Sequence, residues 1–451
     1  MNWLKSHLSE KAVMFIIASA VGLLSGIAAH LLKLMIDGVS SLLTSRFATE
    51  GINWWLLAIP LVGILLTRVF MRYVIHRVIS HGVKRLIVSL KNKIYCLGSY
   101  LLYSPMIASS LTLGFGGSAG SEDPIAYTGA AIGSNMGRWF GLRSDLVRVM
   151  VGCGAAAGIA GVFKAPIGGA LFALEVLRMQ FTTLSVIVLL VAALIAGLTA
   201  YALSGCTMDI GFYMHIPLGF DAYPYVLFLG LFCGVYSIYY SFIMKWVEVW
   251  LDKVSNRWIS TVLAGMILSC AVFIFPSMYG EGYGVIEKVI NGVSSSVIDG
   301  SVVSGFSPDG WRPVLVSGGI LLLKCFAAGA TTCGGVAGDF APALFAGCMA
   351  GLFFASLLNL LFGLSLPVGL FALLGMAGVM AGAIRAPLMA IFLTVEMSAG
   401  YDYLLPLTLV GALSFGVVRL FTMDNFFHRG ADRNNGIISW LRTELINNKR
   451  G

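Results

Sequence analysis

Residues 164–175 read KAPIGGALFALE, and residues 385–396 read RAPLMAIFLTVE. Each stretch begins with a basic residue, an alanine and a proline, and each ends on a glutamate 11 residues after the basic residue. The apolar run between these ends is shorter than the roughly 20 residues that a helix needs to cross a bilayer. A helix that ends inside the membrane must be buried in protein or line a cavity. The pair therefore predicts two short re-entrant helices in corresponding places.

Two further matches lie upstream of this pair, in the same order. The stretch GSEDP at 120–124 corresponds to GDFAP at 338–342, and GLLSG at 22–26 corresponds to GLFCG at 230–234. Paired halves with Gly/Pro-interrupted segments are typical of transporters whose site lies between inverted repeats. We predict one repeat over about 12–204 and a second over about 223–421.

The composition excludes a soluble or disordered chain. Hydrophobic residues make up 58% of the 451 residues and charged residues 11%, against roughly 25% charged in soluble proteins. No Asp, Glu, Lys or Arg occurs over 94–121, 179–208 or 340–384. We predict an all-α polytopic membrane protein whose residues 1–451 form a single transmembrane domain. The residues after Phe421 are too few for a C-terminal regulatory domain.

The net charge of +8 predicts topology rather than nucleic-acid binding. Seven basic residues and no acid lie over 68–93, and short basic loops mark the cytoplasmic side of a membrane. We expect a cell-membrane protein with this loop and both termini in the cytoplasm. The eight cysteines form no C-x-x-C pair and read as reduced core thiols. No metal or cofactor is predicted.

The glycine-rich stretches 116–124 (GGSAGSEDP) and 334–342 (GGVAGDFAP) predict the site. Each leads through glycines into a helix start, where orphan N–H groups and about half a positive charge favour an anion. Partial charges hold an anion and still release it. Glu122 stands at the first of these helix starts, where its carboxylate competes with the ion. We predict that Glu122 is the gate; the simpler alternative is a helix-capping acid.

These motifs resemble the CLC family of chloride channels and chloride/proton antiporters. The segment 120–124 is similar to the family's gating-glutamate motif, and 338–342 to its second anion-coordinating helix start. GEGYG at 280–284 and the late RAP helix also fit. The resemblance implies a homodimer of inverted-repeat subunits in the lipid bilayer. It also implies an anion, expected to be chloride, held by backbone groups that include those of Gly120, Ser121 and Phe340.

The chain departs from the family pattern at several site positions. The gating motif carries a second pathway acid, Asp123, where glycine is usual. The central anion-binding serine corresponds to His81, with Ser80 beside it, and the inner tyrosine corresponds to Phe427. Position 176, where proton-coupled members often carry a relay glutamate, holds Val176. The valine favours a channel or an uncoupled transporter.

Two site residues have open roles. A protonated His81 would attract an anion near neutral pH, or the imidazole is simply solvated in a basic loop. Asp339, placed beside the anion-binding Phe340, is a protonated buried acid, a salt-bridge partner or a cation-facing group. Lys164, Glu175, Arg385 and Glu396 are expected to be repeat-related structural residues.

The predicted function is passive, channel-like anion conduction gated by Glu122, and not an enzyme activity. Alternatives are a chloride/proton antiporter or a relative selective for another anion, such as fluoride or nitrate. A remote alternative is an intramembrane serine hydrolase, because GGSAG at 116–120 matches G-x-S-x-G. The histidines downstream of Ser118 are His215 and His428, neither in a confident membrane segment.

Overall fold

The computed structural model describes residues 10–45, 53–76, 82–206, 218–293, 297–298, 300–302, 310–398 and 400–428, without the side chains of 423–428. Over these ranges the chain is helical and has no strand. Nine helical segments among the described residues are long and apolar enough to cross a membrane. The prediction of an all-α polytopic membrane protein is confirmed.

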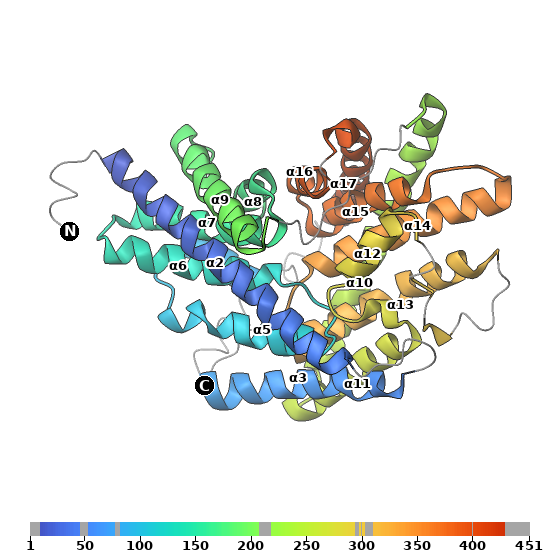
Figure 1. The fold of residues 1–451 in the computed structure, drawn as a ribbon, viewed down its shortest axis with the longest axis horizontal. Helices are drawn as coiled ribbons and strands as arrows, with labels where there is room; N and C mark the ends of the chain where they lie inside the picture. The colour runs from blue at the N-terminus through green and yellow to red at the C-terminus, as the bar shows by residue number, and fades with distance from the viewer. Residues whose placement is uncertain are drawn as a thin grey trace.

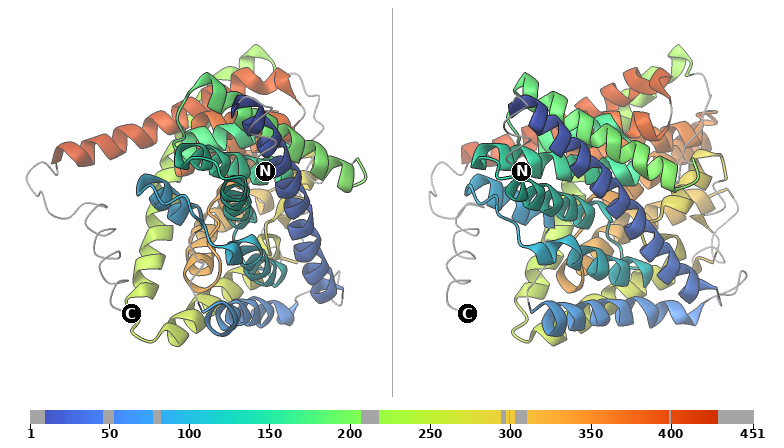
Figure 2. Two further views of the ribbon diagram at one scale, coloured as in Figure 1. Left: turned by 90° about the vertical axis from the view of Figure 1, so that its left-hand side faces the viewer. Right: turned by 60° about the vertical axis from the view of Figure 1, so that its left-hand side comes forward.

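The principal helices are α2 (Glu10–Thr44), α3 (Ile59–Val69), α4 (Gly82–Lys91), α5 (Ser104–Gly114), α6 (Glu122–Trp139), α7 (Ser144–Phe163), α8 (Pro166–Leu171), α9 (Thr183–Leu203), α10 (Tyr223–Asp252), α11 (Arg257–Ile274), α12 (Tyr283–Ile290), α13 (Arg312–Gly334), α14 (Phe340–Phe362), α15 (Val368–Ile384), α16 (Pro387–Met397) and α17 (Leu404–His428). Figure 1 shows most of α2 to α9 on one side and most of the later helices on the other. The short helices α8 and α16 meet between them. Figure 2 shows that the helices cross at many angles rather than forming a parallel bundle.

The backbone breaks in the same way before each short helix. Lys164 ends α7 in the left-handed region with a φ of 54°, and Arg385 ends α15 with a φ of 62°. An extended alanine follows in both places, and then a proline that opens α8 or α16. Proline disfavours helical geometry in the residue before it and suits the first turn of a helix. The KAP and RAP triplets therefore stop one helix and start the next, and the prediction of short re-entrant helices is confirmed.

Each short helix is capped by a carboxylate from the other half of the chain. Glu396 accepts hydrogen bonds from the amides of Ile167 (3.0 Å) and Gly168 (2.7 Å) in α8. Glu175 accepts hydrogen bonds from the amides of Leu388 (3.4 Å) and Met389 (2.9 Å) in α16. The first amides of a helix have no partner within it, and lipid offers none. The two glutamates thus stabilise helix starts in mid-membrane, as repeat-related structural residues.

Many glycines lie where two helices touch. A methyl group at Gly129 in α6 would lie 2.0 Å from the carbonyl oxygen of Gly154 in α7. In the second half, a methyl group at Gly347 in α14 would lie 2.5 Å from the carbonyl oxygen of Gly375 in α15. Such distances leave no room for a side chain. Part of the glycine content therefore serves close helix packing, as is common in membranes.

The helices depart from the sequence pattern in two places. The charge-free run over 94–121 does not form one helix, because a 3-10 turn (Ser99–Leu102) precedes α5, which starts at Ser104 with Pro105 in its first turn. The basic stretch expected as a loop contains α4. That helix buries Val83, Leu86 and Leu90 on one face, so its charged residues lie on the opposite face of an amphipathic helix.

Candidate anion pathway

The starts of α6 and α14 meet backbone to backbone. The amide of Gly120, two residues before α6, donates a hydrogen bond to the carbonyl oxygen of Gly338 at 3.2 Å. A methyl group at Gly338 would lie 2.5 Å from the nitrogen and from the oxygen of Gly120. The two glycine-rich motifs, far apart in the sequence, therefore converge on one point inside the protein.

Glu122, the first residue of α6, folds its carboxylate back onto this junction. The residue is 1% exposed, and its Oε2 atom lies where a methyl group at Gly120 would be. Oε1 accepts a hydrogen bond from the hydroxyl group of Tyr283 in α12. Oε2 has no hydrogen-bond partner among the described residues. Glu122 is thus a buried acceptor that is half satisfied and stands at a helix start.

The amides of the first glycine-rich motif are largely occupied within the protein. The amides of Gly116 and Gly117 bond to the carbonyl oxygens of Leu113 and Thr112 at 2.9 and 2.8 Å. The amide of Ser118 bonds to Thr331 Oγ1 at 3.1 Å. The amide of Ser121 donates to Glu281 Oε1 at 2.7 Å. In this conformation Gly120 and Ser121, both predicted to bind the anion, already have protein partners for their amides.

The second glycine-rich motif, 334–342, has more backbone amides without a partner among the residues described. Within the part of the chain that the structure describes, the amides of Val336, Ala337 and Phe340 donate no hydrogen bond. Phe340 is 3% exposed, and its ring packs against that of Phe163 with centroids 5.5 Å apart. The start of α14 is therefore the part of the junction that offers donors to an anion.

Asp339, the residue before α14, forms an ion pair. Its Oδ2 atom lies 3.3 Å from Lys84 Nζ, and Glu248 Oε1 of α10 lies 3.8 Å from the same nitrogen. The carboxylate of Asp339 raises the pKa of Lys84 above its usual value, because it stabilises the ammonium form. Of the three roles open for Asp339, the geometry matches the salt-bridge partner.

Of the other predicted site residues, Asp123 and Val176 lie within the described ranges. Asp123 is half-buried, and the backbone of Val83 at the start of α4 acts on its carboxylate. Val176 ends the π-helical turn that continues α8. Ser80 and His81 fall outside the described residues, as does the side chain of Phe427.

The serine-hydrolase alternative finds no support in the geometry. Ser118 is 1% exposed, and its hydroxyl group has no hydrogen-bond partner in the described ranges. A nucleophilic serine needs a base within hydrogen-bond reach. The backbone of Ser118 instead ties the first motif to Thr331 of α13, which is a structural role.

Sequence reasoning missed four side chains that contact the site residues, namely Lys84, Glu248, Glu281 and Tyr283. The GEGYG motif at 280–284 was noticed without a role for its members. A glutamate and a tyrosine between glycines were the available signal for Glu281 and Tyr283. No sequence signal pointed to Lys84 or Glu248 in particular, because one lies in a run of basic residues and the other near the end of a long helix.

Comparison with known proteins places this geometry in a family. The H(+)/Cl(-) exchange transporter ClcA of Vibrio vulnificus is 26% identical over 431 residues, which cover 91% of this chain and 88% of that protein. The structure of a slow cyanobacterial Cl-/H+ antiporter matches with a TM-score of 0.76 at 23% identity, covering 92% of this chain and 95% of that chain. A CLC-type fluoride/proton antiporter matches with a TM-score of 0.74 at 22% identity, covering 91% and 96%.

At such identities the two solved structures show a shared fold. The family model described as voltage gated chloride channel matches residues 63–419, which include both glycine-rich motifs and both short helices. The chain is therefore a multi-pass membrane protein that belongs to the voltage gated chloride channel family.

Proposed function

We propose that this protein exchanges chloride for protons across the cell membrane, with Glu122 as the gate. The observation that carries the proposal is the buried Glu122 carboxylate at the junction of two helix starts, with one oxygen unpartnered. A carboxylate at that position occupies the place of an anion. When the carboxylate takes up a proton, it loses its charge and moves away from the junction. The movement of the anion and the movement of the proton then both depend on Glu122.

Exchange is favoured over the passive conduction that Val176 led us to expect. The relative and the two solved structures described above are named as proton-coupled exchangers. Acids other than a glutamate at position 176 lie near the junction, since Asp123, Glu248 and Asp339 all act on Lys84 electrostatically. A glutamate at position 176 is then not required for a proton to reach Glu122 from the cytoplasm.

Proteoliposomes test the proposal. An outward chloride gradient should drive proton uptake, and Glu122→Gln should abolish the uptake because the amide cannot carry a proton. Chloride flux without proton movement in the wild type would restore the channel alternative. A series of replacement anions, from fluoride to nitrate, would identify the substrate, since one solved structure of this fold is a fluoride/proton antiporter.

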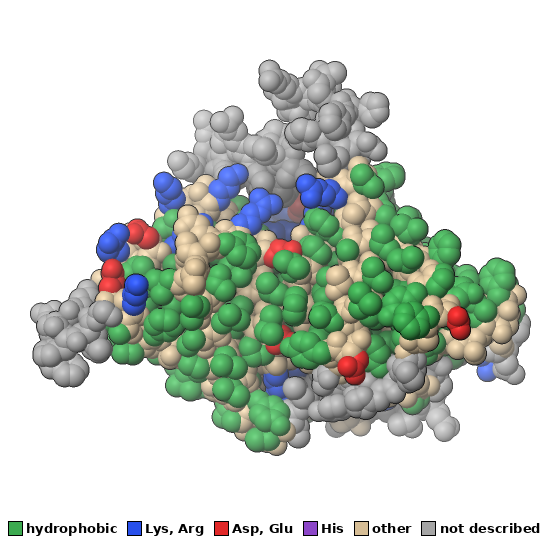
Figure 3. Space-filling model, turned by 90° about the horizontal axis from the view of Figure 1, so that it is seen from above, with side chains coloured by type: hydrophobic (Ala, Val, Ile, Leu, Met, Phe, Trp, Pro, Cys, Tyr) green, Lys and Arg blue, Asp and Glu red, His purple; other side chains and the backbone are tan. Residues whose placement is uncertain are grey.

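We further propose a homodimer that buries the face carrying α8 and α16. A helix that ends in mid-membrane needs protein cover, yet Leu388 of α16 is 49% exposed. The neighbouring α9 exposes Leu190, Leu194 and Leu198 on successive turns. Figure 3 shows this face as a broad hydrophobic surface with Lys and Arg side chains along one edge. Light scattering on the detergent-solubilised protein should give twice the monomer mass.

The basic edge of that face also supports the proposed orientation, with both termini in the cytoplasm. In this proposal residues 1–451 form one membrane domain, whose repeats span about 12–204 and 223–421. Cysteine accessibility from each side of the membrane would test the orientation.

A further inference from the structure

A loop from the second half of the chain reaches the start of α6 with two side chains. Residues 279–282 connect a 3-10 turn to α12, and Gly280 and Gly282 have φ values of 66° and 82°. These left-handed residues turn the loop on either side of Glu281. The hydroxyl group of Tyr279 bonds to the carbonyl oxygen of Gly114 at 2.9 Å. The loop is thus held in place while Glu281 and Tyr283 point at the α6 start.

Glu281 accepts a hydrogen bond from an amide that was predicted to bind the anion. Its Oε1 atom lies 2.7 Å from the amide nitrogen of Ser121, at a helix N-terminus that favours negative charge. The neighbouring amide of Gly120 bonds to Gly338, and the carboxylate of Glu122 folds back onto Gly120. The amides of Gly120 and Ser121 are therefore both occupied, the second of them by the carboxylate of Glu281.

From this arrangement we propose that Glu281 is a second tethered competitor for the anion site at the α6 start. The proposal rests on the function proposed above. An anion that arrives at this helix start must displace two carboxylates, Glu122 and Glu281, rather than one. Glu281 therefore sets the affinity of the site for the transported anion, in addition to the gate at Glu122.

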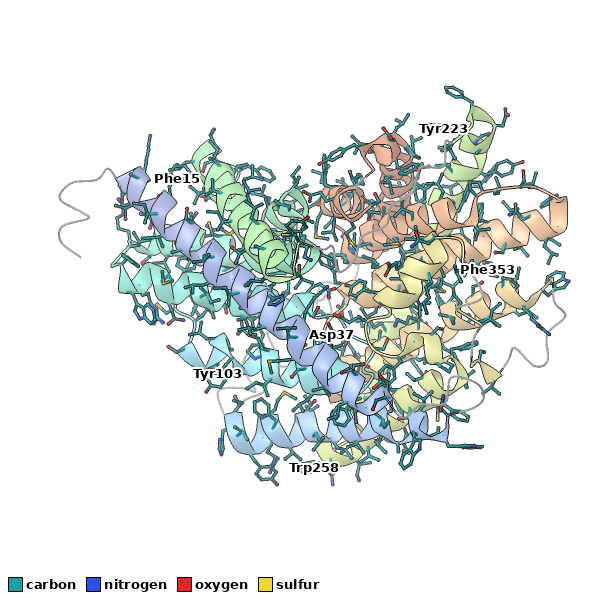
Figure 4. The ribbon with its side chains drawn as sticks, viewed as in Figure 1. Phe15, Asp37, Tyr103, Tyr223, Trp258 and Phe353 are labelled. Carbon is teal, nitrogen blue, oxygen red and sulfur yellow. The ribbon has the colours of Figure 1, made fainter. Side chains whose placement is uncertain are left out.

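The surroundings of Glu281 allow such displacement. The residue is half-buried, so that its carboxylate can exchange the Ser121 amide for water. Lys33 and Asp37 of α2 and Glu122 of α6 act on it electrostatically, and Tyr283 is two residues away. Figure 4 shows Asp37 where α2 passes in front of the middle of the molecule. Two like charges at one helix start repel each other, which weakens the hold of Glu281 on the Ser121 amide.

Calorimetric titration of chloride into the purified protein tests the proposal. Glu281→Gln keeps an oxygen that can accept from Ser121 and removes the negative charge. We expect chloride to bind about threefold tighter or more, since a charge at a helix start is removed. Glu287→Gln, an exposed change on the same α12, is the matched control and should leave the affinity unchanged.

Equal chloride affinity in Glu281→Gln, in the control and in the wild type would overturn the proposal and leave Glu281 as a helix cap. If Glu281→Gln does not give a stable protein, Glu281→Ala removes both charge and cap. Competition predicts tighter binding there as well, whereas a cap predicts weaker or unchanged binding. A wild type that neither binds nor transports chloride would instead refute the proposed function, so the two failures are distinguishable.

Discussion

Oε2 of Glu396 accepts a hydrogen bond from the amide of Gly168 at 2.7 Å, across 228 positions of sequence. The reciprocal contact runs from Glu175 to the amide of Met389 at 2.9 Å. Each half of the chain thus completes a helix that the other half leaves uncapped. The two short helices can end in mid-membrane because the halves are packed together.

Glu396→Ala should destabilise the protein by about 1–3 kcal/mol, because it leaves buried amides without partners. Glu175→Ala should cost less, since one of its two hydrogen bonds is longer, at 3.4 Å. The measurement is the thermal unfolding midpoint in detergent, with Glu287→Ala as the exposed control. A midpoint for Glu396→Ala equal to that of the control would contradict the capping role.

Tyr283→Phe should speed anion transport. The hydroxyl group of Tyr283 holds the Glu122 carboxylate at the junction, and a hydrogen bond to a charged group contributes about 1.5–3 kcal/mol. We expect an increase of at least about fivefold if release of Glu122 limits the rate. In a Glu122→Gln background the same change should have little effect, which a double-mutant cycle of flux rates measures.

The matched control is Tyr239→Phe in α10, which removes an exposed hydroxyl group that bonds to the backbone carbonyl oxygen of Leu322 instead. Its flux should stay near that of the wild type. Additive effects of Tyr283→Phe and Glu122→Gln would show that the two residues act separately.

Lys84→Met should lower chloride flux by about tenfold at low ionic strength. The substitution leaves the carboxylates of Asp339 and Glu248 without their cation, and a negative entrance slows anion entry. The loss should shrink at high salt because of screening. Since Asp339 raises the pKa of Lys84, the lysine of the wild type stays charged across the neutral pH range in which the flux is measured.

Two companion variants check the role of Lys84. Adding Asp339→Asn to Lys84→Met should restore part of the flux. Arg257→Gln breaks an exposed ion pair with Asp252 that is 2.5 Å long, and should change little. Equal losses in Lys84→Met and Arg257→Gln would point to a general effect of surface charge.

Gly129→Ala should destabilise the protein by about 1–3 kcal/mol or prevent its folding, because the new methyl group would meet the carbonyl oxygen of Gly154 in a packed helix contact. Gly416→Ala, in α17, meets nothing within 4 Å. It should stabilise the helix by about 0.5–1 kcal/mol. Unfolding midpoints of both variants give the comparison, and similar midpoints would argue against close packing at Gly129.

Much of the fold was predictable because its signals are local. The apolar runs indicate membrane helices, and the KAP and RAP triplets place the breaks at Lys164 and Arg385 within a residue or two. The break before Ser104 was missed because the apolar run continues through it. The convergence of the two glycine-rich motifs followed from their repetition. The contact between Tyr283 and Glu122 could not be predicted in this way, because the two residues lie 161 positions apart in the sequence.

The amino-acid sequence by itself determined that the chain is a membrane protein, where the KAP and RAP triplets break its helices, and which two glycine-rich stretches lead into helix starts. Those properties depend on hydrophobicity and on the backbone limits of proline and glycine, which act over a few residues. The tertiary structure decided which carboxylate meets which amide: Glu396 with α8, Glu175 with α16, and Glu281 with Ser121. A carboxylate accepts hydrogen bonds from any donor, so its partner is chosen by packing rather than by its own chemistry.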